Sequence, residues 1–308
     1  MSSNKAQHQL WQHLPSVGDI SETLPTYFTD ELLRTSGNAS DWLTKPNSFS
    51  LHSSDELNQC SRRWMQQLVS SPGALRLQLE GTYFEEQQRQ LYAIVSRSLG
   101  YLNNRYGYFF DVKDRGLDYT KEAIPVSKTK AETGYHTDST AKHYLPDIVG
   151  LLCLQPALSG GESLITNAAS LLHFLEERNP SWNDLLHTPL CRDVITPGTV
   201  QDLEAIRAND IPLFQYDHEG GITFRYMRYW IESALEKLKE PTPAGLTELL
   251  DSIDRYFAEE SHAMCFRLER GDMLFVNNHF LCHNRTAFVD GDVPRVYVRA
   301  WINEQPQD

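Results

Sequence analysis

The stretch Asp147-Ile-Val-Gly-Leu-Leu-Cys-Leu-Gln155, which stands between Pro146 and Pro156, decides the class of fold. Its apolar residues follow one another almost without a break, and a proline closes it at each end. A short apolar run with such boundaries is typical of a strand that is buried on both faces. Because a strand of this kind needs neighbouring strands and covering layers, we predict a sheet-based core around it.

Other segments carry strand and helix signals on both sides of this run. Further strands are predicted at 162–166, 221–225, 263–268, 273–276 and 295–302. Because only the turn-like Glu269-Arg-Gly-Asp272 separates 263–268 from 273–276, these two strands are predicted to pair as a hairpin. Helices are predicted at about 54–69, where Ser53 and Glu56 form a capping box, and at 85–99, 229–239 and 243–260, with a shorter helix that ends at Arg178.

Short strands interrupted by helical segments indicate a β-barrel or jelly-roll core with helices packed outside it. A Rossmann fold is not supported, because no G-x-G-x-x-G stretch follows a predicted strand.

Composition narrows the class of partner. The 308 residues carry 28 Lys and Arg against 41 Asp and Glu, a net charge of -13, and no basic stripe is visible, so we predict no nucleic-acid partner. No apolar run approaches the roughly 18 residues that a membrane span needs, so we predict no membrane partner. The N-terminal residues lack the apolar stretch of a secretory signal, and the five cysteines include no C-x-x-C pair. We therefore predict a cytoplasmic protein with reduced thiols.

His136-Thr-Asp138 is the first candidate for chemistry. Residues i and i+2 of a strand point to the same face, so His136 and Asp138 can reach one metal ion together. Imidazole and carboxylate suit iron(II) or a similar divalent ion. Taken alone, the pair is more typical of a solvated loop, since H-x-[DE] pairs also occur by chance.

Two further histidines, His279 and His283, lie just after the predicted strand 273–276. Their H-x-x-x-H spacing is that of a zincin motif, but Phe280 stands where the motif requires Glu, and no helix start signal precedes them. One of the two can be a lone metal ligand from a distant strand. The alternative for either is a hydrogen-bonded core or surface histidine.

The last predicted strand has two different faces. Alternation places on one face Arg295, Tyr297, Arg299 and Trp301. It places on the other face Val296, Val298, Ala300 and Ile302, which we predict to pack against helices. Burying two guanidinium groups costs several kcal/mol each unless anions meet them. The strand therefore predicts a site for one or two carboxylates, the alternative being a solvent-facing edge strand.

Five short pieces occur in a specific order along the chain. They are Gly134-Tyr-His-Thr-Asp-Ser139, the turn Gly160-Gly-Glu-Ser163, the segment 270–278, the block His283-Asn-Arg-Thr-Ala-Phe288, and Arg295-x-x-x-Arg299. Each piece is weak alone, and the Gly-Gly turn by itself is ordinary turn chemistry. Together they make the segment 134–302 resemble the taurine dioxygenase/TfdA-like family of iron(II)- and 2-oxoglutarate-dependent oxygenases, which includes clavaminate-synthase-like members.

This resemblance implies a set of metal ligands. In the family the distal iron ligand lies five residues after an Asn, and here His283 lies five residues after Asn278, whereas His279 falls outside the pattern. The implied ligands are therefore His136, Asp138 and His283. Two histidines and one carboxylate leave three positions open on an octahedral iron(II), which 2-oxoglutarate and dioxygen can fill.

The resemblance also implies roles for the last strand and the Gly-Gly turn. Arg295 matches the family's arginine for 2-oxoglutarate, whose distal carboxylate suits the paired donors of a guanidinium. Ser163 matches a hydroxyl that contacts the same carboxylate. Arg299 matches an arginine that meets the anionic group of the substrate. Tyr297 is expected between the two arginines as a spacer or a hydrogen-bond donor.

The implied fold is a mainly β fold with helices, whose core is a double-stranded β-helix. We expect a single oxygenase domain over 1–308, with a helical or mixed region at 1–110, the jelly-roll core at 111–166 and 263–303, and a helical insertion at 167–262.

The implied activity is oxidation of an unactivated C–H bond in a small anionic or zwitterionic molecule, such as an amino acid or its derivative, with release of succinate and CO2. The carboxylate ligand Asp138 favours hydroxylation, although desaturation or ring closure would use the same iron centre. Two alternatives stay open: the same chemistry on an amino acid tethered to a carrier protein, and a metal-free β-barrel that binds an organic anion through Arg295 and Arg299.

Overall fold

A computed structural model describes residues 7–49, 55–114, 116, 129–139, 141–193 and 202–306. Its centre is a large sheet with the strand order β1-β2-β13-β5-β16-β3, and β4 also pairs with β16. The strands are β1 (Ser21–Leu24), β2 (Ala74–Leu79), β13 (Met273–Asn277), β5 (Ile148–Gln155), β16 (Val296–Asn303), β3 (Tyr101–Leu102) and β4 (Phe110–Val112). The apolar run that was predicted as a buried strand is β5, which lies between β13 and β16.

A smaller sheet faces the large one across a shared core. It has the order β12-β7-β14, with β12 at Ala263–Phe266, β7 at Ser163–Asn167 and β14 at Leu281–Arg285. Buried side chains of both sheets belong to one apolar cluster, for example Cys153 of β5 and Ile165 of β7. Two such sheets around one core form the predicted jelly-roll, a double-stranded β-helix.

The predicted hairpin over 263–276 is wrong. β12 pairs with β7 in the small sheet, whereas β13 pairs with β2 and β5 in the large sheet. The turn between them is real, since the Asp272 N–H donates to the Glu269 carbonyl and the Glu269 N–H to the Asp272 carboxylate. The chain uses this turn to pass from one sheet to the other, so its two strands have different partners.

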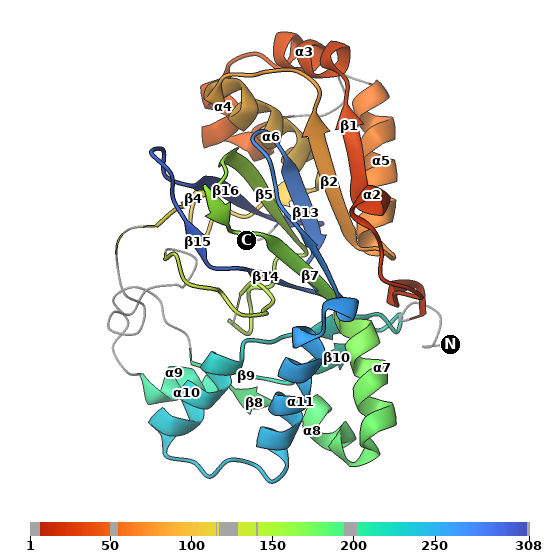
Figure 1. Cartoon of the computed structure of the whole chain (residues 1–308), viewed down its shortest axis with the longest axis vertical. Helices are drawn as coiled ribbons and strands as arrows, with labels where there is room; N and C mark the ends of the chain where they lie inside the picture. The colour runs from red at the N-terminus through yellow and green to blue at the C-terminus, as the bar shows by residue number, and fades with distance from the viewer. Residues whose placement is uncertain are drawn as a thin grey trace.

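The N-terminal region covers the outer face of the large sheet, at the top of Figure 1. Its helices are α2 (Val17–Ile20), α3 (Thr26–Thr35), α4 (Ala39–Thr44), η1 (Pro46–Ser48), α5 (Asp55–Val69) and α6 (Glu85–Leu99). Helix α6 has the predicted bounds; Ser53, the predicted cap of α5, lies outside the described residues. Val298, Ala300 and Ile302 of β16 pack in one cluster with the apolar side of α6, as predicted.

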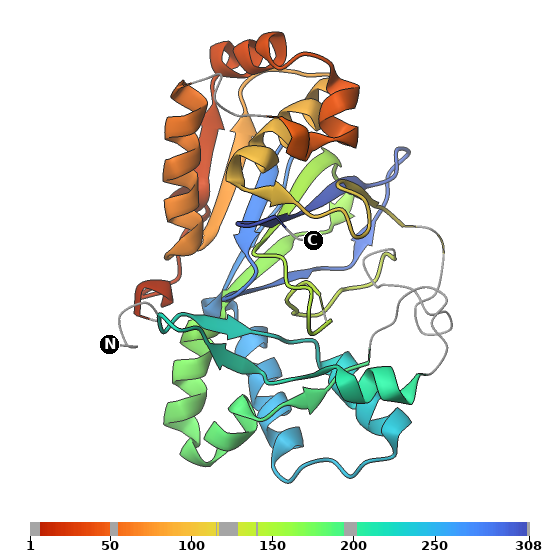
Figure 2. The same ribbon diagram turned by 180° about the vertical axis from the view of Figure 1, so that it is seen from behind.

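The segment between β7 and β12 forms the opposite end of the molecule, which Figures 1 and 2 show from two sides. Its helices are α7 (Ala168–Arg178), η3 (Pro180–Trp182), α8 (Asn183–His187), α9 (Leu203–Ala208), α10 (Arg228–Leu238), α11 (Leu246–Ala258) and η4 (Glu260–His262). Two short strand pairs join them: β8 (Leu190–Cys191) with β9 (Asp210–Ile211), and β10 (Phe214–Tyr216) with β11 (Ile222–Phe224). A third pair, β6 (Ser159–Gly160) with β15 (Phe288–Val289), lies beside the small sheet.

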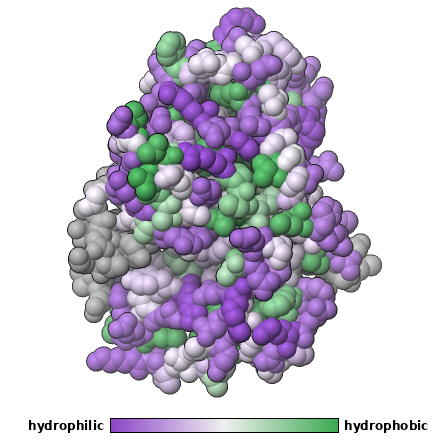
Figure 3. Space-filling model, in the orientation of Figure 1, coloured by the Kyte–Doolittle hydropathy of each residue, from purple (hydrophilic) through white to green (hydrophobic). Residues whose placement is uncertain are grey.

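The surface and the cysteines agree with the composition. The face in Figure 3 is mainly hydrophilic, with hydrophobic side chains in small groups. Within the described ranges, no helix has the length and apolar character to cross a membrane. All five cysteines are free thiols.

Candidate active site

Three predicted ligands lie together between the loop at 134–139 and strand β14. His136 and His283 form an isolated antiparallel bridge, in which each backbone N–H donates to the other residue's carbonyl at 3.0 Å. One side-chain ligand atom from each of His136, Asp138 and His283 lies within 4.8 Å of the other two. In the part of the chain that the structure describes, no other His, Cys, Asp or Glu cluster has this compactness.

The donor atoms of this trio fit a divalent metal ion. The Nε2 atoms of His136 and His283 lie 3.6 and 3.5 Å from Oδ1 of Asp138. Two ligand atoms that bind one metal at right angles are about 3 Å apart, so a small adjustment closes the site. Nδ1 of His136 donates to the Gly134 carbonyl, because a carbonyl can only accept; a neutral His136 therefore has its lone pair on Nε2.

Neighbouring charges and burial shift the pKa values of Asp138 and His283 in the directions that favour cation binding. Burial raises the pKa of the Asp138 carboxyl, but the Arg299 charge and the two imidazoles outweigh burial, so this pKa lies well below its usual value. Burial, followed by the neighbouring His136, lowers the pKa of His283. An ionised carboxylate and a neutral imidazole are the forms that bind metal.

The second oxygen of Asp138 is held from the side of β16. Trp301 Nε1 donates to Oδ2 of Asp138 at 2.6 Å, and Arg299 Nη1 donates to the same oxygen at 3.1 Å. The acidic partner of Arg299 is therefore a proposed metal ligand, and it lies outside the insertion. Asp138 is 4% exposed. Its Oδ1 faces the two imidazoles, and its Oδ2 accepts hydrogen bonds from β16.

Side chains from other elements form hydrogen bonds with the backbone of the loop that carries His136 and Asp138. The side chain of Asn278, at the end of β13, accepts from the Asp138 N–H and donates to the Asp138 carbonyl. From the insertion, Arg225 donates to the carbonyls of Ser139 and Ala141, each at 2.8 Å. Sequence reasoning missed Arg225; burial lowers its pKa to about 10, and no local motif marks it.

His279 is placed apart from the trio. Its Nε2 lies 2.7 Å from Asp147 Oδ1, and its Nδ1 lies 2.9 Å from the Thr223 hydroxyl. Both ring nitrogens therefore have partners, and the residue links β13 to the insertion.

Arg295 occupies a buried space that lacks a counter-ion among the described residues. Its guanidinium stacks 3.7 Å from the centre of the Tyr297 ring and lies 5.1 Å from that of Phe288. Nε and Nη1 have no hydrogen-bond partner there, although the side chain is 4% exposed. A Cβ on Gly161 would lie 3.6 Å from Nε, so the Gly-Gly turn borders this guanidinium.

Arg285 is a second buried cation at this place, and sequence reasoning missed it. Its guanidinium lies 4.8 Å from the centre of the Phe288 ring, and Nη2 donates to the Ala131 carbonyl. Nε has no partner among the described residues. Burial, and after it the charge of Arg295, lowers the pKa of Arg285 to about 10. Its spacing could have indicated it, because Arg285 follows His283 by two residues on one strand and therefore points to the same face.

Ser163 and Tyr297 both belong to this arginine region. Ser163 of β7 stands opposite Arg285 of β14, so the two side chains share a face of the small sheet. The Tyr297 hydroxyl donates to the Leu268 carbonyl at 3.4 Å, and its ring lies under Arg295. Tyr297 is 2% exposed, so the structure places it as a support for Arg295; a contact between Tyr297 and substrate stays a prediction.

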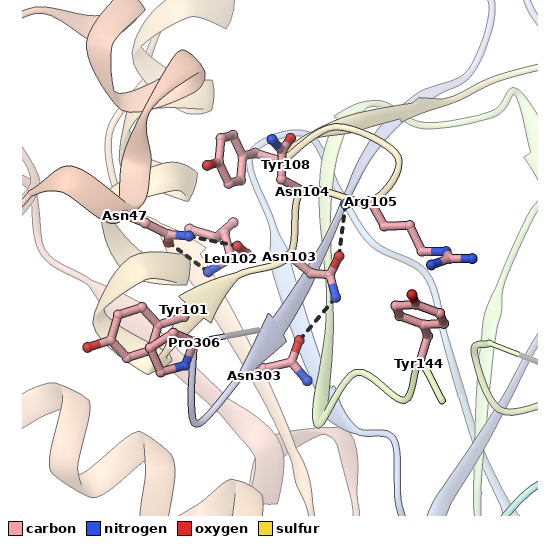
Figure 4. A pocket seen from close by; sticks show the side chains of 10 residues that line it. All are labelled: Asn47, Tyr101, Leu102, Asn103, Asn104, Arg105, Tyr108, Tyr144, Asn303 and Pro306. Carbon is pink, nitrogen blue, oxygen red and sulfur yellow. Dashed lines mark hydrogen bonds between the residues drawn. The ribbon is translucent and has the colours of Figure 1, made fainter. Parts of the chain in front are cut away.

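Two hollows adjoin the face of β16 that carries Arg299. A small one is lined by Asn103, Tyr106, Gly107, Phe110, Arg299 and Trp301. A larger cavity of about 350 Å³ shares Asn103 with the small one and reaches Asn303, two residues after Trp301 (Figure 4). Arg105 and Tyr144 stand against each other at its edge, with the guanidinium 3.4 Å from the ring centre.

The family model for the taurine catabolism dioxygenase TauD, TfdA family matches residues 34–301 of this sequence. The chain belongs to this family. A curated relative, FR-33289 synthase of Streptomyces rubellomurinus (strain ATCC 31215), is 28% identical over 194 residues, which are 60% of this chain and 55% of that protein. The match therefore spans about half of the relative's length.

Two solved structures resemble this TauD family member over most of their length. Asparagine oxygenase, in complex with Fe(II), 3-hydroxyasparagine and succinate, superposes with a TM-score of 0.65 at 16% identity and covers 92% of this chain and 94% of that chain. The non-heme iron oxygenase OrfP, in complex with Fe and α-ketoglutaric acid, gives a TM-score of 0.62 at 14% identity with the same coverage. At these identities the likeness establishes the fold.

Proposed function

We propose that this TauD family member is an iron(II)- and 2-oxoglutarate-dependent dioxygenase that hydroxylates a small anionic or zwitterionic molecule. The observation that carries the proposal is the convergence of His136, Asp138 and His283, together with buried arginines that have no counter-ion among the described residues. When bound, iron(II) with 2-oxoglutarate and dioxygen supplies an oxidant for a C–H bond and releases succinate and CO2. The three side chains would hold the iron, while Asn278 and Arg225 keep the loop of His136 and Asp138 in place.

Arg295 and Arg285 would receive the distal carboxylate of 2-oxoglutarate. Among the described residues, Nε and Nη1 of Arg295 and Nε of Arg285 are buried donors without partners, and an anion would offset both the repulsion between the two guanidinium groups and the cost of burying them. Phe288 and Tyr297 supply ring faces that orient the two guanidinium groups. Ser163, opposite Arg285, adds a hydroxyl to the same region.

Arg299 would bind the anionic group of the substrate. One of its nitrogens is used by Asp138, and the side chain also lines the small hollow beside the trio. Phe110 and Trp301 flank the guanidinium, with ring centres 5.5 and 5.1 Å away. An anion in this hollow would lie next to the metal trio, which is where a reacting C–H bond must be held. An amino acid or its derivative fits this requirement, and asparagine oxygenase, with the same fold, holds a hydroxylated amino acid.

A second candidate substrate is an amino acid tethered to a carrier protein. The observation that favours it is the larger cavity that Asn103 also lines, which would take a chain extending from the small hollow along β16. The assay below tests this candidate alongside free amino acids, while the cytoplasmic location stays a prediction.

The test is an anaerobic loading with iron(II) and 2-oxoglutarate, followed by oxygen and a screen of free and carrier-bound amino acids. Succinate release coupled to a product 16 Da heavier than its substrate supports hydroxylation, where the added mass is one oxygen atom. A product 2 Da lighter would indicate desaturation or ring closure. A protein that binds 2-oxoglutarate equally well with and without metal, and releases no succinate, would instead be an organic-anion binder.

A further inference from the structure

We infer that Trp301 and Arg299 are positioning residues that hold one carboxylate oxygen of Asp138 and so present the other oxygen to the metal. The inference deepens the proposed function and rests on it, since it concerns how the proposed metal ligand is held. Neither residue lies in the loop that carries Asp138; both come from β16, on the other side of the site.

The contacts on Asp138 divide cleanly between its two oxygens. Oδ1 lies 3.5 and 3.6 Å from the imidazole Nε2 atoms of His283 and His136. Oδ2 accepts from the Trp301 indole and the Arg299 guanidinium. A carboxylate without those donors is free to rotate about its last bond and to offer either oxygen, or both, to a cation.

The division matters because of the number of coordination positions. Two imidazoles and one carboxylate oxygen leave three positions of an octahedral metal for 2-oxoglutarate and dioxygen. A carboxylate that bound through both oxygens would occupy a further position. Hydrogen bonds to the outer oxygen of a ligating carboxylate are the kind of support whose loss weakens metal binding about 10–100-fold.

Trp301 is built for this role rather than for core packing alone. Its ring is partly buried, stands edge-on to Tyr106 at 5.4 Å and lies over the Arg299 guanidinium. The second donor, Arg299, is fixed between Phe110 and Trp301. Two donors that lie two residues apart on β16 therefore reach Oδ2 of Asp138, and each is held by an aromatic contact.

The test replaces the indole donor and leaves an aromatic ring, in Trp301→Phe. The matched control is Trp64→Phe, because the Trp64 indole also donates to a carboxylate, Glu22 at 3.1 Å, in the N-terminal region. The probe is Mn(II) alone, without 2-oxoglutarate or oxygen. The readout is the Mn(II) dissociation constant, which is obtained from the electron paramagnetic resonance signal of free Mn(II).

We expect the Mn(II) dissociation constant to rise about tenfold or more in Trp301→Phe and to stay within twofold of wild type in Trp64→Phe. The melting temperature of the metal-free proteins shows whether each variant is folded. If Trp301→Phe does not fold, Arg299→Lys replaces it, since lysine keeps the charge but loses the planar group that Phe110 and Trp301 hold against Asp138, and the same weakening is expected.

Wild-type affinity for Mn(II) in a folded Trp301→Phe, or equal weakening in Trp64→Phe, would overturn the inference. A wild-type protein that binds no Mn(II) would instead overturn the proposed function. The two failures are therefore distinguishable in one titration series.

Discussion

The side-chain amide of Asn278 makes two hydrogen bonds to the backbone of Asp138. Its oxygen accepts from the Asp138 N–H at 2.7 Å, and its nitrogen donates to the Asp138 carbonyl at 3.0 Å. The same nitrogen also donates to the Pro146 carbonyl at 3.0 Å. A residue at the end of β13 thus fixes a metal-ligand candidate that is 140 positions away in the sequence.

Replacement of Asn278 by alanine should destabilise the protein and weaken metal binding. The variant leaves buried backbone groups without partners, which costs about 1–3 kcal/mol each. The control is Asn277→Ala: its side chain is also buried and makes two such bonds, donating to the Leu68 carbonyl and accepting from the His279 N–H. Urea unfolding should show comparable losses for both variants, while Mn(II) titration should show weakened binding for Asn278→Ala alone. Equal metal affinities in the two variants would contradict a specific role of the Asn278 hydrogen bonds in holding Asp138.

Alanine at His136, Asp138 or His283 should each remove iron binding and turnover while the protein stays folded. All three side chains contribute a ligand atom to the same compact group. His279→Ala is the control, because its imidazole is engaged by Asp147 and Thr223 instead. Iron content after anaerobic reconstitution measures the effect. Loss of iron in His279→Ala with retention in His283→Ala would show that the ligand assignment is wrong.

Arg295→Ala should weaken 2-oxoglutarate binding by about 2–5 kcal/mol, the usual loss when one partner of a buried charge pair is truncated. Arg295→Lys should recover only part, since a lysine cannot reproduce the fork. Arg285→Met should also weaken binding, because its guanidinium borders the same space. The absorption band of the iron complex with 2-oxoglutarate provides the titration, with Arg267→Ala as the control. Arg267 donates to the Ala157 carbonyl and is not part of the proposed carboxylate site.

Unchanged 2-oxoglutarate affinity in Arg295→Ala would move the carboxylate to another arginine. Arg285→Met and Arg299→Ala, measured in the same series, identify which one. An effect in Arg285→Met alone would place the carboxylate on the β14 side of Phe288.

Arg299→Ala should raise the substrate KM or abolish coupled oxidation, with little change in 2-oxoglutarate affinity when iron is saturating. Saturating iron is needed because Arg299 also supports Asp138. Decarboxylation of 2-oxoglutarate should continue without substrate oxidation, since the co-substrate site does not contain Arg299. Succinate and product are quantified in the same reaction. A lower melting temperature with an unchanged KM would leave Arg299 with a structural role only.

The strands and helices that local sequence determines were predictable, and their partners were less so. The bounds of α6 follow from apolar periodicity, and β5 from an apolar run between two prolines. The turn at 269–272 was also visible, but its sequence does not say that β12 and β13 join different sheets. That choice depends on contacts of β13 with β2 and β5, which are distant in the chain.

The candidate site divides in the same way. His136, Asp138 and His283 could be selected because a family pattern marks their spacing, and the structure brings them together. The bonds from Trp301 and Arg299 to Asp138 join residues more than 160 positions apart, and alternation along β16 shows only which way these side chains point. The distance between β16 and the Asp138 loop is a property of the folded barrel.

The iron stoichiometry of the protein with 2-oxoglutarate under anaerobic conditions tests the proposed metal site most directly. One iron(II) per chain is expected in the wild type, with a visible absorption band that requires both iron and 2-oxoglutarate. Neither the iron nor the band is expected in a variant that carries His136→Ala, Asp138→Ala and His283→Ala together. The same stoichiometry and the same band in that triple variant would contradict the assignment of these side chains as the metal ligands.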